Sequence, residues 1–296
     1  LMDEAVLEFA HTNYIPTFRE VVDDLWGQIK NNPIDGHTGT PFFIKELNEY
    51  ATIDAGELFL FGGREKSGKS MMLLQCAVDL IRQGKKVLYI DSELNSRLFT
   101  ARLMAHLTKT EFMKIKTGRY GEDVVEKVDK AIEWMKKRDF THIYVPILDS
   151  QSLYTTVKKV HHTQGIDVLI VDYFKSSGRG DAYENYNELG VITDMVKNTI
   201  CGSMNIAGIG AVQLTATGKI ADSAKIGRNV STVAFLSAKT PEEIEADGPE
   251  CGNTKLRVGI NRNGSQHADD EYIDLQFTGN LIRYDQAKQH VATSPY

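Results

Sequence analysis

The sequence is poor in cysteine, has no long apolar run and carries no excess of basic residues. Its three cysteines, Cys76, Cys201 and Cys251, are far apart and form no C-x-x-C pair, so we expect reduced thiols in a cytoplasmic protein and no zinc site. No apolar run approaches the roughly 18 residues of a membrane span, and the first residues lack the pattern of a secretory signal. We therefore expect no membrane partner. The net charge of −6 excludes a global basic field for nucleic acid, which leaves local basic loops for such contacts.

What the sequence does contain is a complete phosphate-binding loop. A short apolar run, Leu58–Phe61, is expected to be a buried strand, and a helical pattern begins after Ser70. Between them the chain fits the pattern G-x-x-x-x-G-K-S, whose glycines let backbone N–H groups turn toward a polyphosphate at the positive end of the helix. We predict that ATP binds here, with Lys69 on the β and γ phosphates and Ser70 on Mg²⁺. The predicted nucleotide-binding residues are Gly63, Arg64, Glu65, Lys66, Ser67, Gly68, Lys69, Ser70 and Met71.

Downstream of this loop, apolar runs alternate with helical patterns. This order is typical of βαβ units, so we predict an α/β fold, a P-loop NTPase core with a mainly parallel twisted sheet flanked by helices. From Lys255 onward, short apolar runs separated by turns predict antiparallel C-terminal strands. The stretches 176–186 and 240–254 are predicted to be a loop and an exposed acidic excursion. The predicted strands are 58–61, 86–91, 143–145, 167–173, 206–212, 232–237, 255–261, 272–277 and 281–284, and the predicted helices 98–107, 124–134, 155–161 and 189–200.

Three polar residues at the ends of predicted strands are candidates for the chemistry of hydrolysis. Asp172 ends the most apolar strand, where a carboxylate would hold the Mg²⁺ shell. Glu93 follows the strand after the phosphate-loop helix, and a carboxylate there would orient or deprotonate the attacking water; Asp91 is the alternative for this role. Gln213 ends another strand, where it would contact the γ-phosphate and relay its loss to nearby loops.

The segment before the phosphate loop contains a helix and a linker. Residues Thr17 to Ile29 place six apolar side chains on one helical face, and Thr17 with Glu20 forms a capping-box pattern. An isolated helix this short is marginal in water, so its apolar face packs either on its own domain or on a neighbouring subunit. The glycines and prolines between 31 and 41 indicate a linker.

In their order along the chain, these motifs resemble the RecA-like motor domain of DnaB-type replicative helicases, the hexameric 5′→3′ DNA-unwinding enzymes of bacteria and phages. The resemblance covers about Thr17 to Tyr284. It rests on Thr38-Gly39 with the spacing to Gly56-Glu57-Leu58, and on Tyr89-Ile90-Asp91-Ser92-Glu93-Leu94, Lys116-Thr117-Gly118-Arg119, Ile170-Val171-Asp172-Tyr173, Val212-Gln213-Leu214 and Arg262-Asn263-Gly264.

For the chemistry, the resemblance implies that Glu93 is the catalytic carboxylate and Gln213 a sensor of the γ-phosphate. It also implies that the domain has no in-chain arginine for its own ATP, and that Arg262 reaches the ATP of the adjacent subunit. The family usually has a lysine two positions before this arginine. Here Ile260 stands at that position, with Lys255 or Arg257 as candidates to replace the missing cation.

For the assembly, the resemblance implies a homo-hexameric ring around single-stranded DNA. The family's DNA-holding loops correspond to about 176–187 and 215–230, and the second contains residues suited to sequence-independent phosphate contact: Lys219, Lys225, Gly227 and Arg228. The helix at 17–29 corresponds to the family's linker helix, which packs on the adjacent motor domain. We therefore predict an N-terminal segment with the linker helix (1–32), a linker leading into the domain (33–55) and a RecA-like ATPase domain (56–296).

The sequence thus predicts the ATP- and Mg²⁺-dependent motor of a replicative helicase in the cytoplasm of a bacterium or a phage-infected cell. Primase and a helicase loader are the further partners that the family implies. Two alternatives stay open: a RecA/RadA-like recombination ATPase that forms open filaments on DNA, and a nucleotide-gated ring scaffold with weak turnover. The Ile260 departure keeps the second of these alternatives open.

Overall fold

The computed structural model describes residues 17–31, 39–175, 182–215 and 224–290, and the chain divides into two units, 1–40 and 41–296. Helix α2 (Phe18–Asn31) is the described element of the first unit. The predicted capping box is confirmed, because the Thr17 N–H donates to Glu20 Oε2 at 2.7 Å and the Glu20 N–H to Thr17 Oγ1 at 3.4 Å. Apolar side chains of this helix, such as Phe18 and Trp26, are exposed, and their packing on another subunit stays a prediction.

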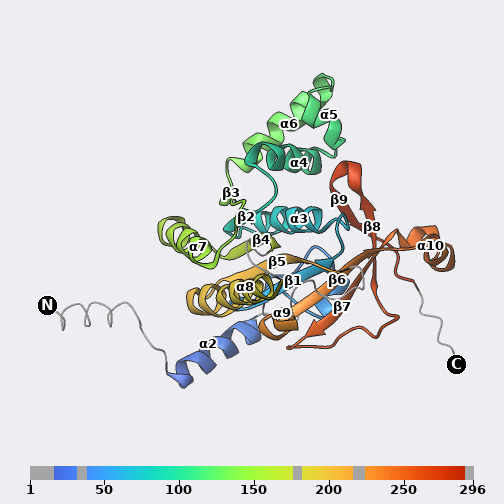
Figure 1. Ribbon diagram of the computed structural model, residues 1–296. Coiled ribbons are helices and arrows are strands. Elements are labelled where there is room, and N and C mark those ends of the chain that lie inside the picture. Colours follow the sequence, from blue (N-terminus) through green and yellow to red (C-terminus); the bar gives the residue numbers. More distant parts are fainter. Residues whose placement is uncertain (1–16, 32–38, 176–181, 216–223, 291–296) are drawn as a thin grey trace. The chain divides into compact units, whose positions relative to one another are not determined.

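A nine-stranded sheet forms the centre of the second unit (Figure 1), in the order β3-β2-β4-β5-β1-β6-β7-β8-β9. The strands from β3 to β6 in this order are parallel, and β7, β8 and β9 are antiparallel. The predicted mainly parallel sheet with antiparallel C-terminal strands is therefore confirmed. The bounds are β1 Leu58–Gly63, β2 Val87–Asp91, β3 Phe140–Tyr144, β4 Val168–Phe174, β5 Ala207–Gln213, β6 Thr232–Ala238, β7 Thr254–Asn261, β8 Ile273–Thr278 and β9 Arg283–Gln286.

Helices cover both faces of this sheet, because successive residues of a strand point to opposite sides. In β1, Phe59 and Phe61 pack in one apolar cluster with α3 (Lys69–Arg82) and α4 (Ser96–Thr108). Leu58 and Leu60 of the same strand pack in a second cluster with the helices of the other face. These are α7 (Ser150–Gln164), α8 (Ala182–Asp194), the π-helical segment η2 (Met195–Gly202) and α9 (Ala224–Asn229). Such a strand is apolar along its whole length, which is why the parallel strands were predictable as continuous apolar runs.

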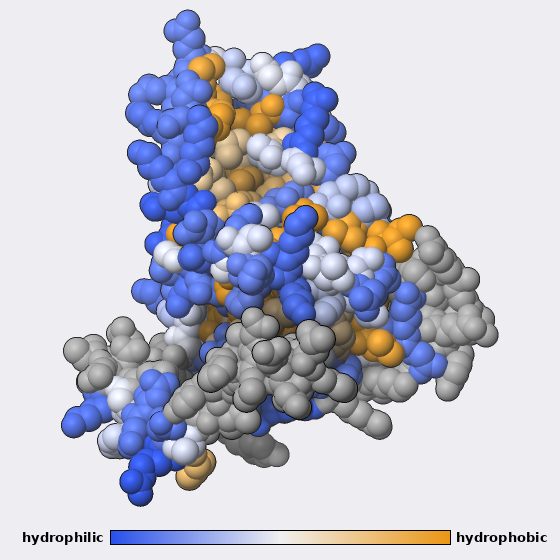
Figure 2. All heavy atoms as spheres, turned by 90° about the vertical axis from the view of Figure 1, so that its left-hand side faces the viewer, coloured by the Kyte–Doolittle hydropathy of each residue, from blue (hydrophilic) through white to orange (hydrophobic). Residues whose placement is uncertain are grey.

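Two more helices, α5 (Phe112–Thr117) and α6 (Glu122–Met135), lie beyond α4 (Figure 1). Partly buried side chains of this lobe, among them Phe112 and Trp134, pack against the core cluster of α3 and α4. Figure 2 shows a band of apolar atoms between polar ones in the part of the surface that this lobe occupies. No helix of the described ranges has the length and apolar character needed to cross a bilayer.

The segment predicted to lead into the domain is packed from Pro41 onward: Phe42, Ile44 and Leu47 are buried in the core, and the short helix η1 (Glu46–Glu49) holds the Asn48 side chain against the Phe42 backbone. One segment differs from the sequence prediction in extent. Helix α8 begins at Ala182, so the predicted loop 176–186 ends earlier. A polar composition does not distinguish the first turn of a helix from a loop, which explains this difference.

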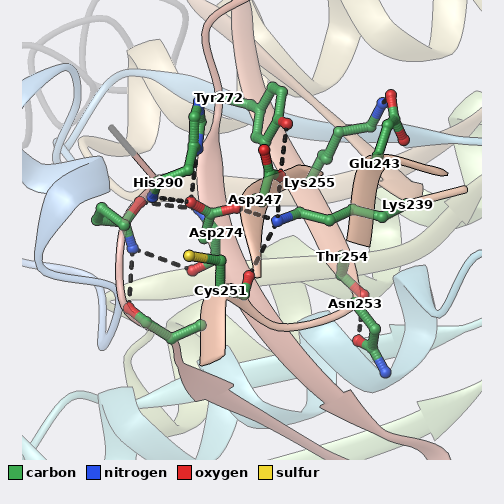
Figure 3. Close-up of polar contacts among 12 residues, drawn as sticks. Lys239, Glu243, Asp247, Cys251, Asn253, Thr254, Lys255, Tyr272, Asp274 and His290 are labelled. Atoms are coloured by element: carbon green, nitrogen blue, oxygen red, sulfur yellow. Dashed lines mark hydrogen bonds and ion pairs between the residues drawn. The ribbon is translucent and has the colours of Figure 1, made fainter. Parts of the chain in front are cut away.

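The acidic excursion 240–254 is exposed over much of its length, as its composition predicted, since Glu242, Glu245 and Glu250 are exposed and Glu243 and Asp247 are partly buried. It folds into α10 (Pro241–Asp247) and η3 (Pro249–Cys251), and a second short helix, η4 (Gly279–Leu281), joins β8 to β9. Figure 3 shows what holds the end of α10: Lys239 is buried, and its Nζ lies 2.7 Å from Asp247 Oδ2, 2.5 Å from Asp274 Oδ1 and 3.0 Å from the Cys251 carbonyl oxygen. An acidic stretch is thus bound to a lysine that precedes it in the sequence.

Candidate nucleotide-binding site

Strands β1, β2, β4 and β5 are parallel neighbours, so their carboxyl ends meet at one edge of the sheet. In open parallel sheets this edge is the usual place for a ligand. A cleft of about 430 Å³ lies there. Eight of the described residues that line it belong to the predicted site, and four were not predicted. The predicted ones are Glu65, Lys66, Gly68, Lys69, Ser70, Met71, Glu93 and Gln213, and the others are Arg102, Tyr173, Phe277 and Gly279.

The phosphate loop needs its glycines for steric reasons that the structure makes specific. A Cβ on Gly63 would meet the Ser67 hydroxyl and the Leu236 carbonyl oxygen, so the loop could not fold back on itself. Gly68 has φ +91°, and a Cβ there would collide with the Tyr284 hydroxyl. Helix α3 starts directly after it, at Lys69. The loop therefore presents backbone N–H groups and the positive end of a helix to the cleft, as anion binding requires.

Lys69 is held inside this loop. Its Nζ donates to the carbonyl oxygens of Gly63, at 2.9 Å, and Arg64, at 2.7 Å. Burial lowers the pKa of Lys69, whereas the charges of Asp172 and Glu93 act in the opposite direction. Because its hydrogen bonds go to neutral carbonyl groups, the ammonium lies at the cleft with its charge available to an anionic ligand.

Asp172 lies beneath the cleft and is fully buried. Its Oδ1 accepts a hydrogen bond from Ser70 Oγ at 3.0 Å, and its Oδ2 accepts one from the Tyr89 hydroxyl at 2.7 Å. Burial raises the pKa of Asp172 to about 7, and the neighbouring Asp91 adds to the increase. A raised pKa means that the charged form of this group is poorly stabilised, so a cation beside it would be favoured. Carboxylate and hydroxyl oxygens are the ligands that Mg²⁺ prefers, so Ser70 and Asp172 fit the cation predicted for this position.

The two candidates for the catalytic carboxylate have different surroundings. Asp91 is fully buried, and its Oδ1 accepts hydrogen bonds from the backbone N–H groups of Glu93, at 2.8 Å, and Leu94, at 2.7 Å. Glu93 is exposed and lines the cleft, beside Tyr173. A group that acts on water at the nucleotide must reach the cleft, so the geometry favours Glu93, while Asp91 holds the turn that carries it.

Gln213 and Arg262 occupy different regions of the structure. Gln213 ends β5 and lines the cleft, and the next residue, Leu214, donates its N–H to the Gly63 carbonyl oxygen at 3.0 Å, which ties this strand end to the phosphate loop. Arg262 follows β7 with an exposed side chain and is not among the described residues that line the cleft. A role for Arg262 at a nucleotide therefore requires a second subunit.

The candidates to replace the missing lysine are both paired with acids: Lys255 with Glu243, and Arg257 with Asp269 at 2.7 Å. Ile260 itself packs in the apolar cluster on the face of the sheet that α7, η2 and α9 cover. Its Cδ1 lies 3.2 Å from where a Cβ on Gly227 of α9 would be. The position at which the family usually has a lysine is thus occupied here by a partly buried apolar side chain that packs against the core.

One cationic residue of the cleft was missed. The resemblance implies that this domain has no in-chain arginine at its own ATP, yet Arg102 of α4 lines the cleft. Its Nε has no hydrogen-bond partner among the described residues, and its guanidinium carbon lies 5.9 Å from the centre of the Phe112 ring. The signal in the sequence was an arginine beside the apolar residues Leu103 and Met104 of a predicted helix, but a helical pattern alone does not say which ligand site a helix borders.

The residues predicted to contact DNA are only partly described. Lys219 lies outside the described residues. Lys225 and Arg228 belong to α9, but their side chains lie outside what the structure describes. Gly227 is within α9, and this helix packs against α8. Helix α8 begins inside the first predicted DNA loop. The DNA contacts therefore stay a prediction.

Comparison with known proteins identifies a family of helicase domains. The model of the family described as "DnaB-like helicase C terminal domain" matches residues 39–286. Among individual proteins, the "Probable plasmid replicative DNA helicase" of Chlamydia psittaci is 25% identical over 246 residues, which are 78% of this chain and 53% of that protein. The "Replicative DNA helicase DnaB" of Helicobacter pylori (strain ATCC 700392 / 26695) is 22% identical over 237 residues, 74% of this chain and 48% of that protein. The chain thus spans about half the length of these two relatives.

Solved structures show the same fold. One of them, an isolated ATPase domain, matches with a TM-score of 0.79 at 14% sequence identity, covering 93% of this chain and 100% of that one. Another, a DnaB-like replicative helicase described together with its interactions with primase, matches with a TM-score of 0.75 at 14% identity, covering 97% of this chain and 72% of that one. The predicted RecA-like core is therefore confirmed as a fold.

Proposed function

Because this chain belongs to the family of DnaB-like helicase C-terminal domains, we propose that it is the ATP-hydrolysing motor of a replicative DNA helicase. One observation carries the proposal: a single cleft gathers a phosphate loop with its lysine, a hydroxyl group above a buried carboxylate, an exposed carboxylate and a strand-end amide. These are the parts that phosphoryl transfer to water requires, namely a phosphate cradle, oxygen ligands for Mg²⁺, a group that orients water and a sensor.

In this proposal the triphosphate lies on the loop 63–71, with the N–H groups at the start of α3 and the ammonium of Lys69 on its phosphates. Ser70 and Asp172 would hold Mg²⁺, which would supply positive charge to the triphosphate. The raised pKa of Asp172 supports this assignment, because a nearby cation stabilises the charged form of a buried carboxyl group.

Glu93 orients the attacking water and accepts its proton, and Gln213 responds to the γ-phosphate. Arg262 of the adjacent subunit completes the site, since its own chain does not bring it to the described lining of the cleft. Arg102 adds a cation from within the chain. Arg102 lines the cleft, so its guanidinium is placed to offer N–H donors to a phosphate.

The chain acts as a homo-hexamer that moves along single-stranded DNA in the 5′→3′ direction and unwinds the duplex, in the bacterial or phage-infected cytoplasm. The loops around 176–187 and 215–230, with Lys219, Lys225, Gly227 and Arg228, contact the DNA backbone. A primase and a helicase loader are the expected partners. Support for a primase comes from one structural neighbour, a DnaB-like replicative helicase that is described as interacting with primase.

The test is DNA-stimulated ATP hydrolysis by the wild type and by Glu93→Gln, with Glu126→Gln as the matched control on the exposed face of α6. We expect Glu93→Gln to lose at least about 10²-fold in kcat, because it removes the general base, while it still binds a labelled ATP analogue. Glu126→Gln should behave as the wild type. Full hydrolysis by Glu93→Gln would contradict the proposal.

The same assay tests the shared site when Arg262→Ala is mixed with the wild type. Alone, this variant should lose about 10³-fold or more in kcat. In mixtures on forked DNA, a cooperative ring predicts that unwinding falls more steeply than the wild-type fraction. A linear decline, or open filaments on single-stranded DNA by electron microscopy, would instead support a recombination ATPase, and nucleotide-dependent rings without turnover would support a scaffold.

A further inference from the structure

Behind Glu93, two buried polar side chains face each other without a hydrogen bond. Asp91, the last residue of β2, is fully buried, and its Oδ2 has no hydrogen-bond partner in the described part of the chain. His142 lies in the adjacent edge strand β3, its side chain is 8% exposed, and its Nε2 also lacks a partner among those residues. The two atoms are 3.7 Å apart. Buried polar atoms without partners are rare and costly, so two of them facing each other beside the cleft require an explanation.

The orientation of His142 is fixed by α4. The imidazole stacks on the Phe99 ring, with 4.0 Å between the ring centres and 19° between the planes. Its Nδ1 lies 3.3 Å from Ser96 Oγ. When the serine hydroxyl donates to Nδ1, the neutral imidazole carries its proton on Nε2, the atom that faces Asp91. In this tautomer the ring faces the Asp91 carboxylate as a donor.

The other oxygen of Asp91 connects this arrangement to the candidate catalytic residue. Its Oδ1 accepts the backbone N–H groups of Glu93 and Leu94, which form the turn between β2 and α4. Neither Asp91 nor His142 is among the described residues that line the cleft. A chain of three contacts thus leads from α4 through His142 and Asp91 to the backbone of Glu93.

We propose that His142 and Asp91 form a positioning pair that fixes the turn bearing Glu93 in the geometry needed for hydrolysis. The inference rests on the proposed function of Glu93. Catalytic hydrogen bonds are often long in the free enzyme and shorten when substrate is bound, and the Nε2–Oδ2 distance needs to shorten by less than about 1 Å. Because both side chains act through the backbone of Glu93, their loss lowers kcat and leaves nucleotide affinity unchanged.

A double-mutant cycle tests the pair in DNA-stimulated ATP hydrolysis. Asp91→Asn keeps the shape and an oxygen acceptor but loses the charge, and His142→Phe keeps the stack on Phe99 but loses both nitrogens. We expect each single variant to lose about 10-fold in kcat, with the nucleotide Kd within about twofold of the wild type. The double variant should also lose about 10-fold, since removing either partner already breaks the pair. His162→Phe, on the exposed side of α7, is the matched control and should leave kcat unchanged.

Rescue separates positioning from folding. His142→Gln places an amide N–H near the former Nε2, so it should recover most of the activity that His142→Phe loses. Thermal melting of each variant shows whether it is folded. The proposal is overturned if the two single effects multiply to about 100-fold in the double variant, if the Kd changes in place of kcat, or if a folded His142→Gln is as slow as His142→Phe. If Glu93→Gln hydrolyses ATP normally, the proposed function fails; if it is inactive while the pair shows no coupling, only this inference fails.

Discussion

Two regions of this molecule bury carboxylates side by side, and they differ in what neutralises them. In the C-terminal part, Asp247 and Asp274 share the ammonium of Lys239 (Figure 3), and His290 Nδ1 lies 2.7 Å from Asp274 Oδ2. At the cleft, Asp91 and Asp172 are register partners on neighbouring strands. The nearby Lys69 gives its hydrogen bonds to loop carbonyl groups instead. One region contains its own cation, and in the other the two carboxylates are not paired with Lys69, which is consistent with the Mg²⁺ site proposed there.

The pKa values of the carboxyl groups follow this difference. Although burial opposes it, the hydrogen bonds from Lys239 and Tyr272 hold the pKa of Asp247 below its usual value. Burial raises the pKa of Asp172 to about 7, and the charge of Asp91 adds to this despite two hydrogen bonds from hydroxyl groups. A buried ionic cluster is costly to break, because loss of one partner leaves an uncompensated buried charge, whereas groups with a raised pKa in a cleft are typical of a functional site.

The largest expected effect comes from removing the built-in cation. Lys239→Met leaves Asp247 and Asp274 buried without their shared partner, which should lower the free energy of unfolding by about 3–5 kcal/mol. Urea denaturation measures this. Lys288→Met is the matched control, because its ion pair with Glu250 is exposed and should contribute less than about 1 kcal/mol. If the free energy of unfolding fell equally in the two variants, the buried cluster would contribute no more to stability than an exposed ion pair.

The next largest effect is a pH dependence of the free energy of unfolding, caused by Asp172. Below about pH 4 its carboxyl group is protonated in both the folded and the unfolded chain. Between about pH 4 and 7 the folded chain keeps a proton that the unfolded chain releases, so this group makes the free energy of unfolding fall as pH rises, by up to about 1.4 kcal/mol per pH unit. Asp172→Asn should remove this slope, as measured by urea denaturation at pH 5 to 8 without divalent cations.

A variant of Asp247, in the C-terminal cluster, should show a different pH dependence of stability. The pKa of Asp247 is lowered on folding, so its carboxylate stabilises the fold above its ordinary pKa, and that stability is lost as the pH falls through the lowered pKa of the folded chain. Asp247→Asn should therefore lower the free energy of unfolding by a constant amount throughout pH 5 to 8, and, because it keeps Asp172, it should retain the pH slope of the wild type. If the free energy of unfolding depended on pH in the same way in both variants, the two regions would not differ in the way proposed.

The sequence predicted the cleft better than the C-terminal cluster, for a physical reason. The phosphate loop is a local pattern in which eight consecutive residues carry the chemistry, and Glu93, Asp172 and Gln213 follow apolar strands whose ends must meet at one edge of a parallel sheet. The residues of the Lys239 cluster come from the end of β6, α10, β8 and the segment after β9, and no spacing in the sequence brings them together.

The sequence also did not show which way individual side chains face. A helical pattern predicted α4, but it did not show that Arg102 faces the cleft. Asp91 and Glu93 are two residues apart in the sequence, and only the structure separates the buried acceptor from the exposed side chain. Likewise the sequence did not show that Ile44 and Leu47, in the segment that leads into the domain, are buried, because residues flanked by glycine and proline give no periodic pattern.

The smallest expected effect concerns a tyrosine that joins the C-terminal strands to the phosphate loop. Tyr284 of β9 is buried, its backbone is bonded on both sides by the Gln75 amide at 2.7 and 2.8 Å, and its hydroxyl donates to the Ser67 carbonyl oxygen at 3.3 Å. Tyr284→Phe removes only this last bond, so it should lower the free energy of unfolding by about 0.5–1 kcal/mol and raise the nucleotide Kd no more than about threefold. Tyr144→Phe, at an exposed position of β3, is the control for both measurements. An increase of the nucleotide Kd well beyond threefold, with a free energy of unfolding that falls by no more than about 1 kcal/mol, would mean that the C-terminal strands set the shape of the phosphate loop. The C-terminal region would then contribute directly to the nucleotide site.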